Sequence, residues 1–263
     1  MSPRRIGGLC LRHLYILKGS WPRLLEMAYW PTINVVMWGF TSRFFAQHSS
    51  WVADAGGILI GAVLLWDVMF RGNLGVALSF LEEMWSRNLG HLSVSPLRPM
   101  ELVAAMLCMS FVRTLIGVLP ATLIAIPLYH YSIFDLGLPL IAFWVNLMVS
   151  GWAMGLLVSS LVLRFGLGAE SLAWVLIFAV APLAGIYYPI STLPEILQVV
   201  AWALPPAHVF EGMRSIMLGH GLRTDLLVSA MALNAAYLVL GSVVFLRVWQ
   251  GARIRGALLN VGE

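Results

Sequence analysis

Three charged residues lie within long apolar runs of the sequence, where an ionised side chain is costly. Asp67 and Arg71 fall in the run 56–80, and Arg113 falls in the run 102–129. A charge at membrane depth costs several kcal/mol unless it is paired or faces a polar cavity. Asp67 and Arg71 are four residues apart and share one helix face, so we expect Asp67 to pair with Arg71 or Arg113. This cluster is either a polar patch or latch on a transport route, or an internal staple between two helices.

The other ionisable residues form no catalytic or metal-binding pattern. Asp67 is the only acidic residue deep in an apolar run, whereas an intramembrane enzyme needs paired carboxylates or histidines. The six histidines lack metal-ligand spacing, and Cys10 and Cys108 are too widely separated in sequence to suggest a zinc site or a disulfide framework. Ion-coupled transporters usually contain repeats or several ionisable groups at membrane depth, and the sequence contains no internal repeat. We predict no catalytic residue, no metal and no cofactor bound by this chain.

A nucleotide site is also missing from the sequence. No G-x-x-x-x-G-K-[ST] phosphate loop occurs, and the single lysine, Lys18, lies in no glycine-rich context. An ATP-driven role would therefore require a separate ATPase subunit.

The elements that carry these residues are expected to be membrane helices. Apolar residues make up 60% of the 263 residues and charged residues only 11%, whereas a soluble domain contains about 25% charged residues. A helix needs about 20 apolar residues to cross a bilayer. Six runs meet this length approximately: 24–45, 56–80, 102–129, 136–163, 172–188 and 226–248. The sequence predicts an all-α membrane protein with six transmembrane helices in a single domain, 1–263.

The basic residues orient these helices. With both termini on the cytoplasmic side, eleven Lys and Arg residues fall in inside segments and only three, Arg43, Arg214 and Arg223, fall outside. This asymmetry follows the positive-inside rule. The basic residues form no dense stripe, so nucleic acid is not an expected partner. We expect a multi-pass protein of the bacterial inner membrane with cytoplasmic termini.

Glycine and proline residues predict details of the helix packing. Gly151 and Gly155 form a G-x-x-x-G pair, which permits two helices to approach closely. Pro120, Pro127 and Pro182 are expected to kink the helices that contain them.

The predicted cytoplasmic segment 81–101 is richer than a simple linker. It mixes charged residues with large apolar ones, which is the composition of a binding surface. Alternatively, it is an interfacial helix that lies on the lipid headgroups with Trp85 as its anchor. The residues alone do not decide between these two interpretations.

The predicted extracellular segment 189–223 is apolar but cannot cross the membrane. Only ten residues lie between Pro194 and Pro205, so we expect a re-entrant helical hairpin before the last span. Glu211 and Arg214 are three residues apart and are expected to pair, either for function or merely to neutralise two interfacial charges. The candidate hairpin residues are Tyr188, Pro189, Pro194, Pro205, Glu211 and Arg214.

The N-terminal segment 1–20 has the pattern of a basic amphipathic helix. Leucines and isoleucines alternate with Arg12, His13 and Lys18. Such a helix lies at the inner membrane interface, where it can act as a lipid anchor.

Two motifs resemble a known family. Phe80-Leu-Glu-Glu-Met-Trp-Ser-Arg-Asn-Leu, followed by Ser95-Pro-Leu and Glu101, resembles the coupling-helix region of type-2 ABC exporter permeases. Tyr-Pro-x-Ser-x-Leu-Pro, followed by Pro-x-His-x-x-Glu-x-x-Arg, is similar to the extracellular hairpin of the same family. The family includes drug, lipid, polysaccharide and nodulation-factor exporters, and the resemblance covers nearly the whole chain.

The resemblance implies partners and a cargo class. Two copies of an ABC ATPase subunit would hold ATP and magnesium, and a second permease copy would complete a homodimer in membrane lipid. The implied ATPase-coupling residues are Glu82, Glu83, Met84, Trp85, Arg87, Asn88 and Leu89. The cargo would be amphipathic: a drug, a lipid or a lipid-linked saccharide. A permease specific for polysaccharides or lipo-oligosaccharides is the alternative, because tryptophan rings can stack on sugars; an ion-coupled transporter is less favoured.

Overall fold

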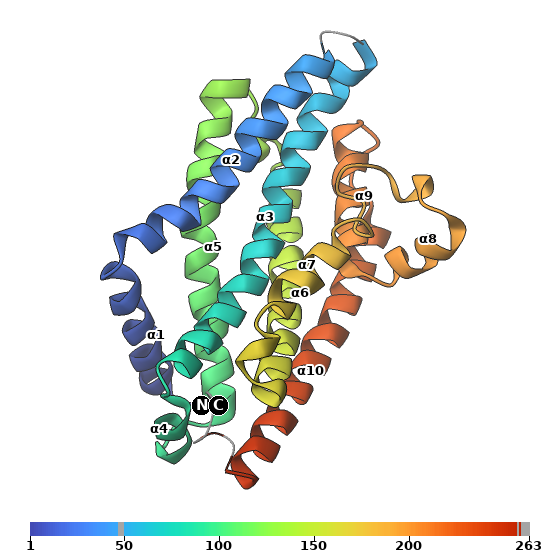
Figure 1. The fold of residues 1–263 in the computed structure, drawn as a ribbon. Helices are drawn as coiled ribbons and strands as arrows, with labels where there is room; N and C mark the ends of the chain where they lie inside the picture. Colours follow the sequence, from blue (N-terminus) through green and yellow to red (C-terminus); the bar gives the residue numbers. More distant parts are fainter. Residues whose placement is uncertain (47–49, 257, 259–263) are drawn as a thin grey trace.

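A computed structural model describes residues 1–46, 50–256 and 258. The described residues form helices joined by turns, and no strand occurs among them (Figure 1). The α-helices are α1 (Pro3–Lys18), α2 (Trp21–Ala46), α3 (Ser50–Trp85), α4 (Leu89–Val94), α5 (Pro99–Tyr129), α6 (Leu138–Phe165), α7 (Leu172–Val180), α8 (Glu195–Trp202), α9 (Pro205–Met217) and α10 (Thr224–Ile254). Short 3-10 turns lie at Ile133–Leu136, Leu167–Ala169 and Ile190–Thr192.

Within the described residues, four helices are long and apolar enough to cross a membrane. They are α5, α6, α10 and the part of α3 from Gly57 to Trp85. This result supports an all-α membrane protein that crosses the bilayer several times. Helix α2 is not among the four; it has 26 residues but carries Arg23, Glu26 and Arg43.

The predicted run 172–188 is helical only in its first half. Helix α7 ends at Val180, and turns and bends follow up to Tyr188. Pro182 cannot donate to a helical hydrogen-bond ladder, and Gly185 has a left-handed φ of 68°. A helix of nine residues is about 14 Å long, which is about half the thickness of the hydrocarbon core. Length therefore does not support α7 as a complete span, and Pro182 lies beyond the helix instead of kinking it.

Helix α3 is the centre of the bundle and packs against α2, α5 and α6. The close contact of α3 with α6 depends on the predicted glycine pair. A Cβ atom at Gly151 would lie 2.5 Å from the Met69 carbonyl oxygen, and one at Gly155 would lie 2.6 Å from Cβ of Val76. The packing interpretation of the G-x-x-x-G pair is confirmed.

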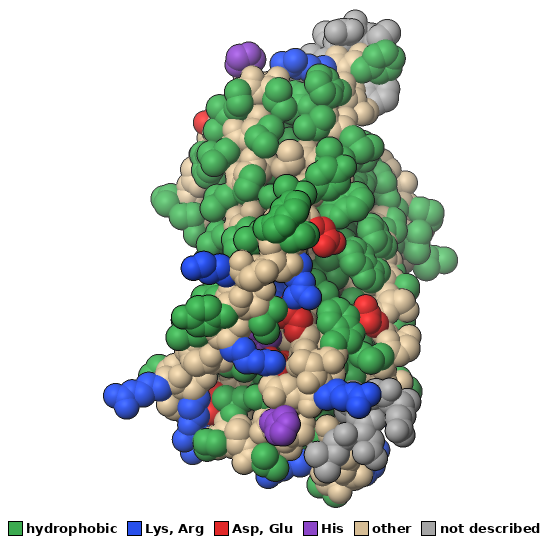
Figure 2. Space-filling model, turned by 60° about the vertical axis from the view of Figure 1, so that its left-hand side comes forward, with side chains coloured by type: hydrophobic (Ala, Val, Ile, Leu, Met, Phe, Trp, Pro, Cys, Tyr) green, Lys and Arg blue, Asp and Glu red, His purple; other side chains and the backbone are tan. Residues whose placement is uncertain are grey.

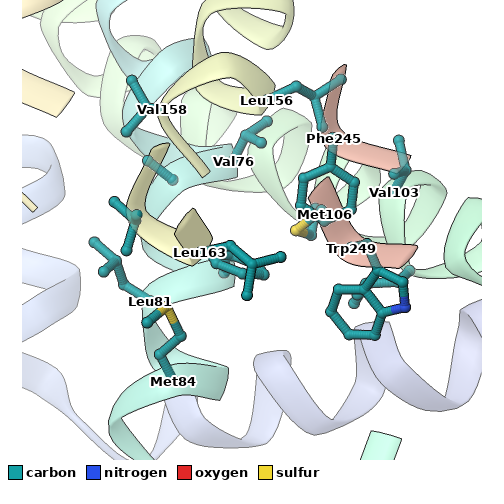
Figure 3. Packing of buried hydrophobic residues seen from close by; sticks show 14 of the residues in the cluster. Val76, Leu81, Met84, Val103, Met106, Leu156, Val158, Leu163, Phe245 and Trp249 are labelled. Carbon is teal, nitrogen blue, oxygen red and sulfur yellow. The ribbon is translucent and has the colours of Figure 1, made fainter. Parts of the chain in front are cut away.

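Helix α10 packs on α6 and α9 at the other side of the bundle. A buried polar contact joins α10 to α6: the Asn234 amide donates to Oδ1 of Asn146 over 2.9 Å, and Asn234 Oδ1 accepts a hydrogen bond from Ser150 over 2.7 Å. Deeper in the bundle, apolar side chains from four helices converge (Figure 3). The central ones are Val76, Met106, Leu156 and Phe245.

Helix α1, helix α4 and the last turns of α10 lie at one end of the molecule (Figure 1). Here α3 continues to Trp85, five residues beyond the predicted end of the run at residue 80. The segment between the two spans is correspondingly short, with only six residues in α4. Residues 81–85 are thus part of the long helix, and the helix carries Glu82 and Glu83 into the bundle.

Two short helices, α8 and α9, follow the turns after α7. Pro194 is the N-cap of α8 and Pro205 is the first residue of α9, so the prolines begin these helices. Helix α9 packs against α6 and α10. Helix α8 exposes apolar side chains instead, with Ile196 81% exposed.

Candidate functional site

A cavity of about 600 Å³ lies between α2, α3, α5, α7 and the turn after α7. Its lining contains both aromatic and charged side chains. The aromatic residues are Trp30, Trp38, Trp66, Phe70, Trp85, Trp174, Phe178 and Tyr187. The charged residues are Arg23, Glu26, Asp67, Arg71, Glu82 and Arg113. The volume is in the range of small-molecule sites, about 300–1,000 Å³.

Aromatic contacts hold two parts of this lining together. Trp38 of α2 stacks on Tyr187, with ring centroids 4.7 Å apart. Phe70 of α3 lies 5.7 Å from both Trp174 and Phe178 of α7. The first contact links α2 to the turn after α7, and the second links α3 to α7, so any relative movement of these elements reshapes the cavity.

Asp67 is buried in this cavity without an ion pair. Its side chain is 2% exposed, and Oδ1 accepts a 3.4 Å hydrogen bond from the Asn34 amide. Its Oδ2 has no partner among the described residues, nor has Nε of Arg71. Gly117 leaves the space that the Arg71 side chain occupies, since a Cβ there would lie 2.5 Å from Arg71 Cδ. The predicted pairing of Asp67 with Arg71 is contradicted.

The predicted pairing of Asp67 with Arg113 is also wrong. Arg113 of α5 binds Glu82 at 2.7 Å between Nη2 and Oε2. Because α3 extends to Trp85, Glu82 lies inside the bundle, where it is a nearer acceptor than Asp67. The staple between α3 and α5 exists, but its acid is Glu82.

Glu82 and Glu83 together hold four helices. The ring of His13 on α1 lies between them, with Nδ1 3.0 Å from Glu82 Oε2 and Nε2 3.2 Å from Glu83 Oε1. Arg12 of α1 pairs with Glu83, and Arg23 of α2 lies 3.4 Å from Glu82. We call Arg12, His13, Arg23, Glu82, Glu83 and Arg113 the inner charge network. Charged side chains of both signs occur in the middle and lower part of the face shown in Figure 2, below a largely hydrophobic region.

A second contact fastens the start of α1 to the start of α5. Glu101 Oε1 accepts a 2.7 Å hydrogen bond from the Ser2 backbone, and Oε2 accepts one of 2.9 Å from the Arg98 backbone. Arg5 lies 3.4 Å from the same carboxylate. The amphipathic pattern predicted α1, but it gave no sign of these partners.

The seven predicted coupling residues divide into buried and accessible ones. Glu83, Met84 and Leu89 are buried, and Glu82 is nearly so. Asn88 is half-buried and donates to Glu83 Oε2 over 2.6 Å. Trp85 is 46% exposed, and Arg87 is exposed with a left-handed φ of 51°. A direct contact with another subunit therefore stays a prediction for Trp85 and Arg87, whereas the buried members position them.

The predicted pair in the segment 189–223 is formed. Glu211 Oε1 accepts hydrogen bonds of 2.8 Å from Arg214 and from the Ile190 backbone. Arg214 also donates to the Gly185 carbonyl oxygen over 2.7 Å. The pair thus fixes α9 to the turns after α7. Tyr188 closes the same turn, since its hydroxyl donates to the Pro182 carbonyl oxygen over 2.7 Å, while Pro189 precedes the turn Ile190–Thr192.

Residues 16–218 match the model of a protein family described as ABC-2 type transporter. The chain belongs to this family. The matched region contains α2 to α9, and therefore the cavity, α4 and the Glu211–Arg214 pair. A search of curated proteins gave no match.

An ABC-2 type transporter is a membrane subunit of an ABC transporter, and the family lacks an ATPase domain of its own. The resemblance that the two motifs carry is therefore confirmed. Family membership implies an ABC ATPase as a partner in general. It makes the cavity a candidate for cargo binding and the end near α4 a candidate for contact with the ATPase.

Proposed function

We propose that the chain is the permease subunit of an ATP-driven exporter, which moves an amphipathic cargo out across the bacterial inner membrane. The cavity carries this proposal: its lining combines aromatic and charged side chains, which suits a molecule with an apolar body and a polar group. A separate ATPase subunit would bind ATP and magnesium and supply the energy.

The proposed membrane arrangement has six crossings and cytoplasmic termini. Helix α2, at 26 residues, is about 39 Å long and would be the first crossing despite its charges. Helix α7, together with the turns that follow it, would be the fifth. Helices α8 and α9 would form a hairpin in the outer leaflet, and the exposed apolar face of α8 at Ile196 and Val199 suits contact with lipid. The distribution of eleven basic residues inside against three outside supports this orientation.

The proposed coupling route runs along α3. Trp85 and Arg87 would contact the ATPase, together with α4. Helix α3 is continuous from Trp85 to Asp67 in the cavity, and the inner charge network ties its end to α1, α2 and α5. ATP-driven closure of two ATPase subunits on a permease homodimer would therefore move α4 together with the part of the cavity lining that α3 contributes.

A polysaccharide or lipo-oligosaccharide cargo is the second candidate. The stacked rings of Trp38 and Tyr187 favour it, because flat aromatic faces in a cavity wall pack well against sugar rings. Both candidates require the same coupling to an ATPase.

Co-purification and stimulated hydrolysis with candidate ABC ATPase subunits test the proposal. In reconstituted vesicles, the complex should hydrolyse ATP faster when its cargo is present, among a panel of lipids, drugs and glycolipids. Trp85→Ala with Arg87→Glu should remove most of the bound ATPase, because both side chains are accessible at the proposed contact. The matched control is His220→Ala, an exposed residue outside that contact. Unchanged ATPase binding in the double variant would contradict the coupling assignment, and the failure of every candidate ATPase to bind would overturn the proposed function.

A further inference from the structure

Two charges of opposite sign, the buried Asp67 and the half-buried Arg71, line the cavity without forming an ion pair with each other. Asp67 is 2% exposed, and its Oδ2 accepts no hydrogen bond from the described residues. Arg71, one helical turn further along α3, keeps an unpartnered Nε atom. Leaving charged hydrogen-bonding groups buried and unmatched is costly, and such costs are usually recovered by a ligand or by solvent. The residues that line the cavity thus include an unpartnered acceptor on Asp67 and unpartnered donors on Arg71 and Arg113.

Among the other charged residues that line the cavity, Glu26 attracts Arg71, although the two side chains form no ion pair. Glu82 is already bound by Arg113, His13 and Arg23. Arg113 is correspondingly occupied by Glu82, and Asn34 donates to the other oxygen of Asp67. A bound molecule would therefore meet Asp67 and Arg71, with Glu26 close to Arg71.

The signs of the two charges select the ligand. An anionic group would satisfy Arg71 but would be repelled by Asp67 within the same low-dielectric cavity. A cationic group would satisfy Asp67 but would be repelled by Arg71. A group with separated positive and negative ends satisfies both residues and brings no net charge into the membrane.

The aromatic side chains complete the site. Trp38, Trp66 and Tyr187 line the cavity together with Asp67, and aromatic faces attract an ammonium ion. The same rings provide apolar surface for a hydrocarbon chain. In a headgroup with a short linker, the distance from the ammonium to the phosphate is similar to the rise of one helical turn, which separates Asp67 from Arg71 along α3.

We infer that the cavity binds the zwitterionic headgroup of an amphiphile, with an ammonium at Asp67 and a phosphate at Arg71. This inference rests on the proposed function, because it names the cargo of the same cavity. A primary ammonium fits better than a quaternary one, since only the primary group has N–H bonds to donate to Oδ2 of Asp67. The ligand class is therefore a phosphoethanolamine lipid.

Native mass spectrometry of the purified permease, without an ATPase, tests this inference. The probes are phosphatidylethanolamine, phosphatidylcholine and phosphatidylglycerol with identical acyl chains, and dodecyl maltoside as a neutral glycoside. Phosphatidylethanolamine should bind about tenfold more tightly than the other two lipids, as expected for a charged hydrogen bond. Asp67→Asn and Arg71→Gln should each abolish this preference.

The control variant is Asp225→Asn, which removes an exposed carboxylate outside the cavity and should keep the preference. Thermal unfolding of each variant separates a lost site from a lost fold, and Asn at position 67 retains the shape of the side chain. Equal affinity for the three lipids, or a preference that survives both cavity variants, would overturn the inference. Tightest binding of dodecyl maltoside would overturn it in favour of a saccharide site.

The two proposals fail in different ways. Lipid binding is measured without ATP, so a permease that prefers phosphatidylethanolamine but binds no ATPase would contradict the proposed function alone. A permease that is stimulated by another cargo and ignores the headgroup would contradict only this inference.

Discussion

At the scale of single residues, His13 has an unusual position for a histidine near the start of a chain. It is fully buried, and each ring nitrogen lies near a different carboxylate, at 3.0 Å from Glu82 and 3.2 Å from Glu83. Nδ1 hydrogen-bonds to Glu82, whereas Nε2 lies near Glu83 without a hydrogen-bond partner among the described residues. The ring therefore joins α1 to the end of α3.

Replacing His13 should weaken the contact between α1 and the end of α3. We expect His13→Ala to destabilise the protein by about 1–3 kcal/mol, because two buried carboxylates lose a shared partner. The measurement is thermal or denaturant unfolding in detergent. His220→Ala, at an exposed histidine, is the matched control and should have no measurable effect. Equal stability of the two variants would show that Arg12, Arg23 and Arg113 satisfy the carboxylates alone.

The sequence was sufficient to find the charged residues but not their partners. Asp67, Arg71 and Arg113 were recognisable because each interrupts an apolar run. The pairing was wrong because Glu82 was assigned to a cytoplasmic segment, whereas α3 carries it into the bundle beside Arg113. Partners that are distant in sequence, such as His13 and Glu83, carry no local signal of their contact.

At the scale of helices, the distance between α3 and α6 is set by small residues. At Gly151 an added Cβ would lie 2.5 Å from the Met69 carbonyl oxygen and 2.8 Å from the Asn73 backbone nitrogen. Neither backbone atom can move without shifting a helix. The cavity wall on α3 is therefore positioned partly by a residue that has no side chain.

Gly151→Ala should separate these two helices. We expect a loss of about 1–3 kcal/mol in stability, as for other overpacked interiors. The matched control is Gly168→Ala, since a Cβ at that position has no atom within 4 Å. Unfolding temperature and the size-exclusion profile in detergent measure the effect. A Gly151→Ala protein as stable as the control would contradict the close contact.

The apolar runs predicted the helices of the bundle well, but they gave the wrong C-terminal ends for α3 and α7. The pattern of apolar residues located α3, α5, α6 and α10, whereas α3 continues past the predicted end and α7 stops at Val180. Turns after α7 are nearly as apolar as the helix itself, so composition cannot distinguish them. Their backbone instead depends on contacts with α9, where Glu211 and Arg214 bind the Ile190 and Gly185 backbones.

At the scale of the whole molecule, the inner charge network adjoins both the proposed ATPase contact and the cavity, and three of its members, Arg23, Glu82 and Arg113, line the cavity. Glu82 lines the cavity and lies three residues before Trp85 on α3. Its three partners, His13, Arg23 and Arg113, come from α1, α2 and α5. Movement of α4 is therefore expected to reach several helices at once, and the network would convert a push on one helix into a change in cavity shape.

Glu82→Gln tests this role, because it removes the charge while it keeps the shape of the side chain. We expect the ATPase subunit to bind as in the unchanged protein, since Trp85 and Arg87 remain accessible. Cargo transported per ATP hydrolysed should fall by about tenfold, which corresponds to the loss of one charge-assisted hydrogen bond.

The comparison with Arg87→Glu separates coupling from docking. Arg87→Glu should lose the ATPase itself, whereas Glu82→Gln should keep the ATPase and lose the response of hydrolysis to cargo. Unfolding curves of both variants are required, because Glu82 also stabilises the joint between α1 and α3. If Glu82→Gln is folded and still couples hydrolysis to transport, the network only holds the helices together. The force from the ATPase must then reach the cavity through α3 alone.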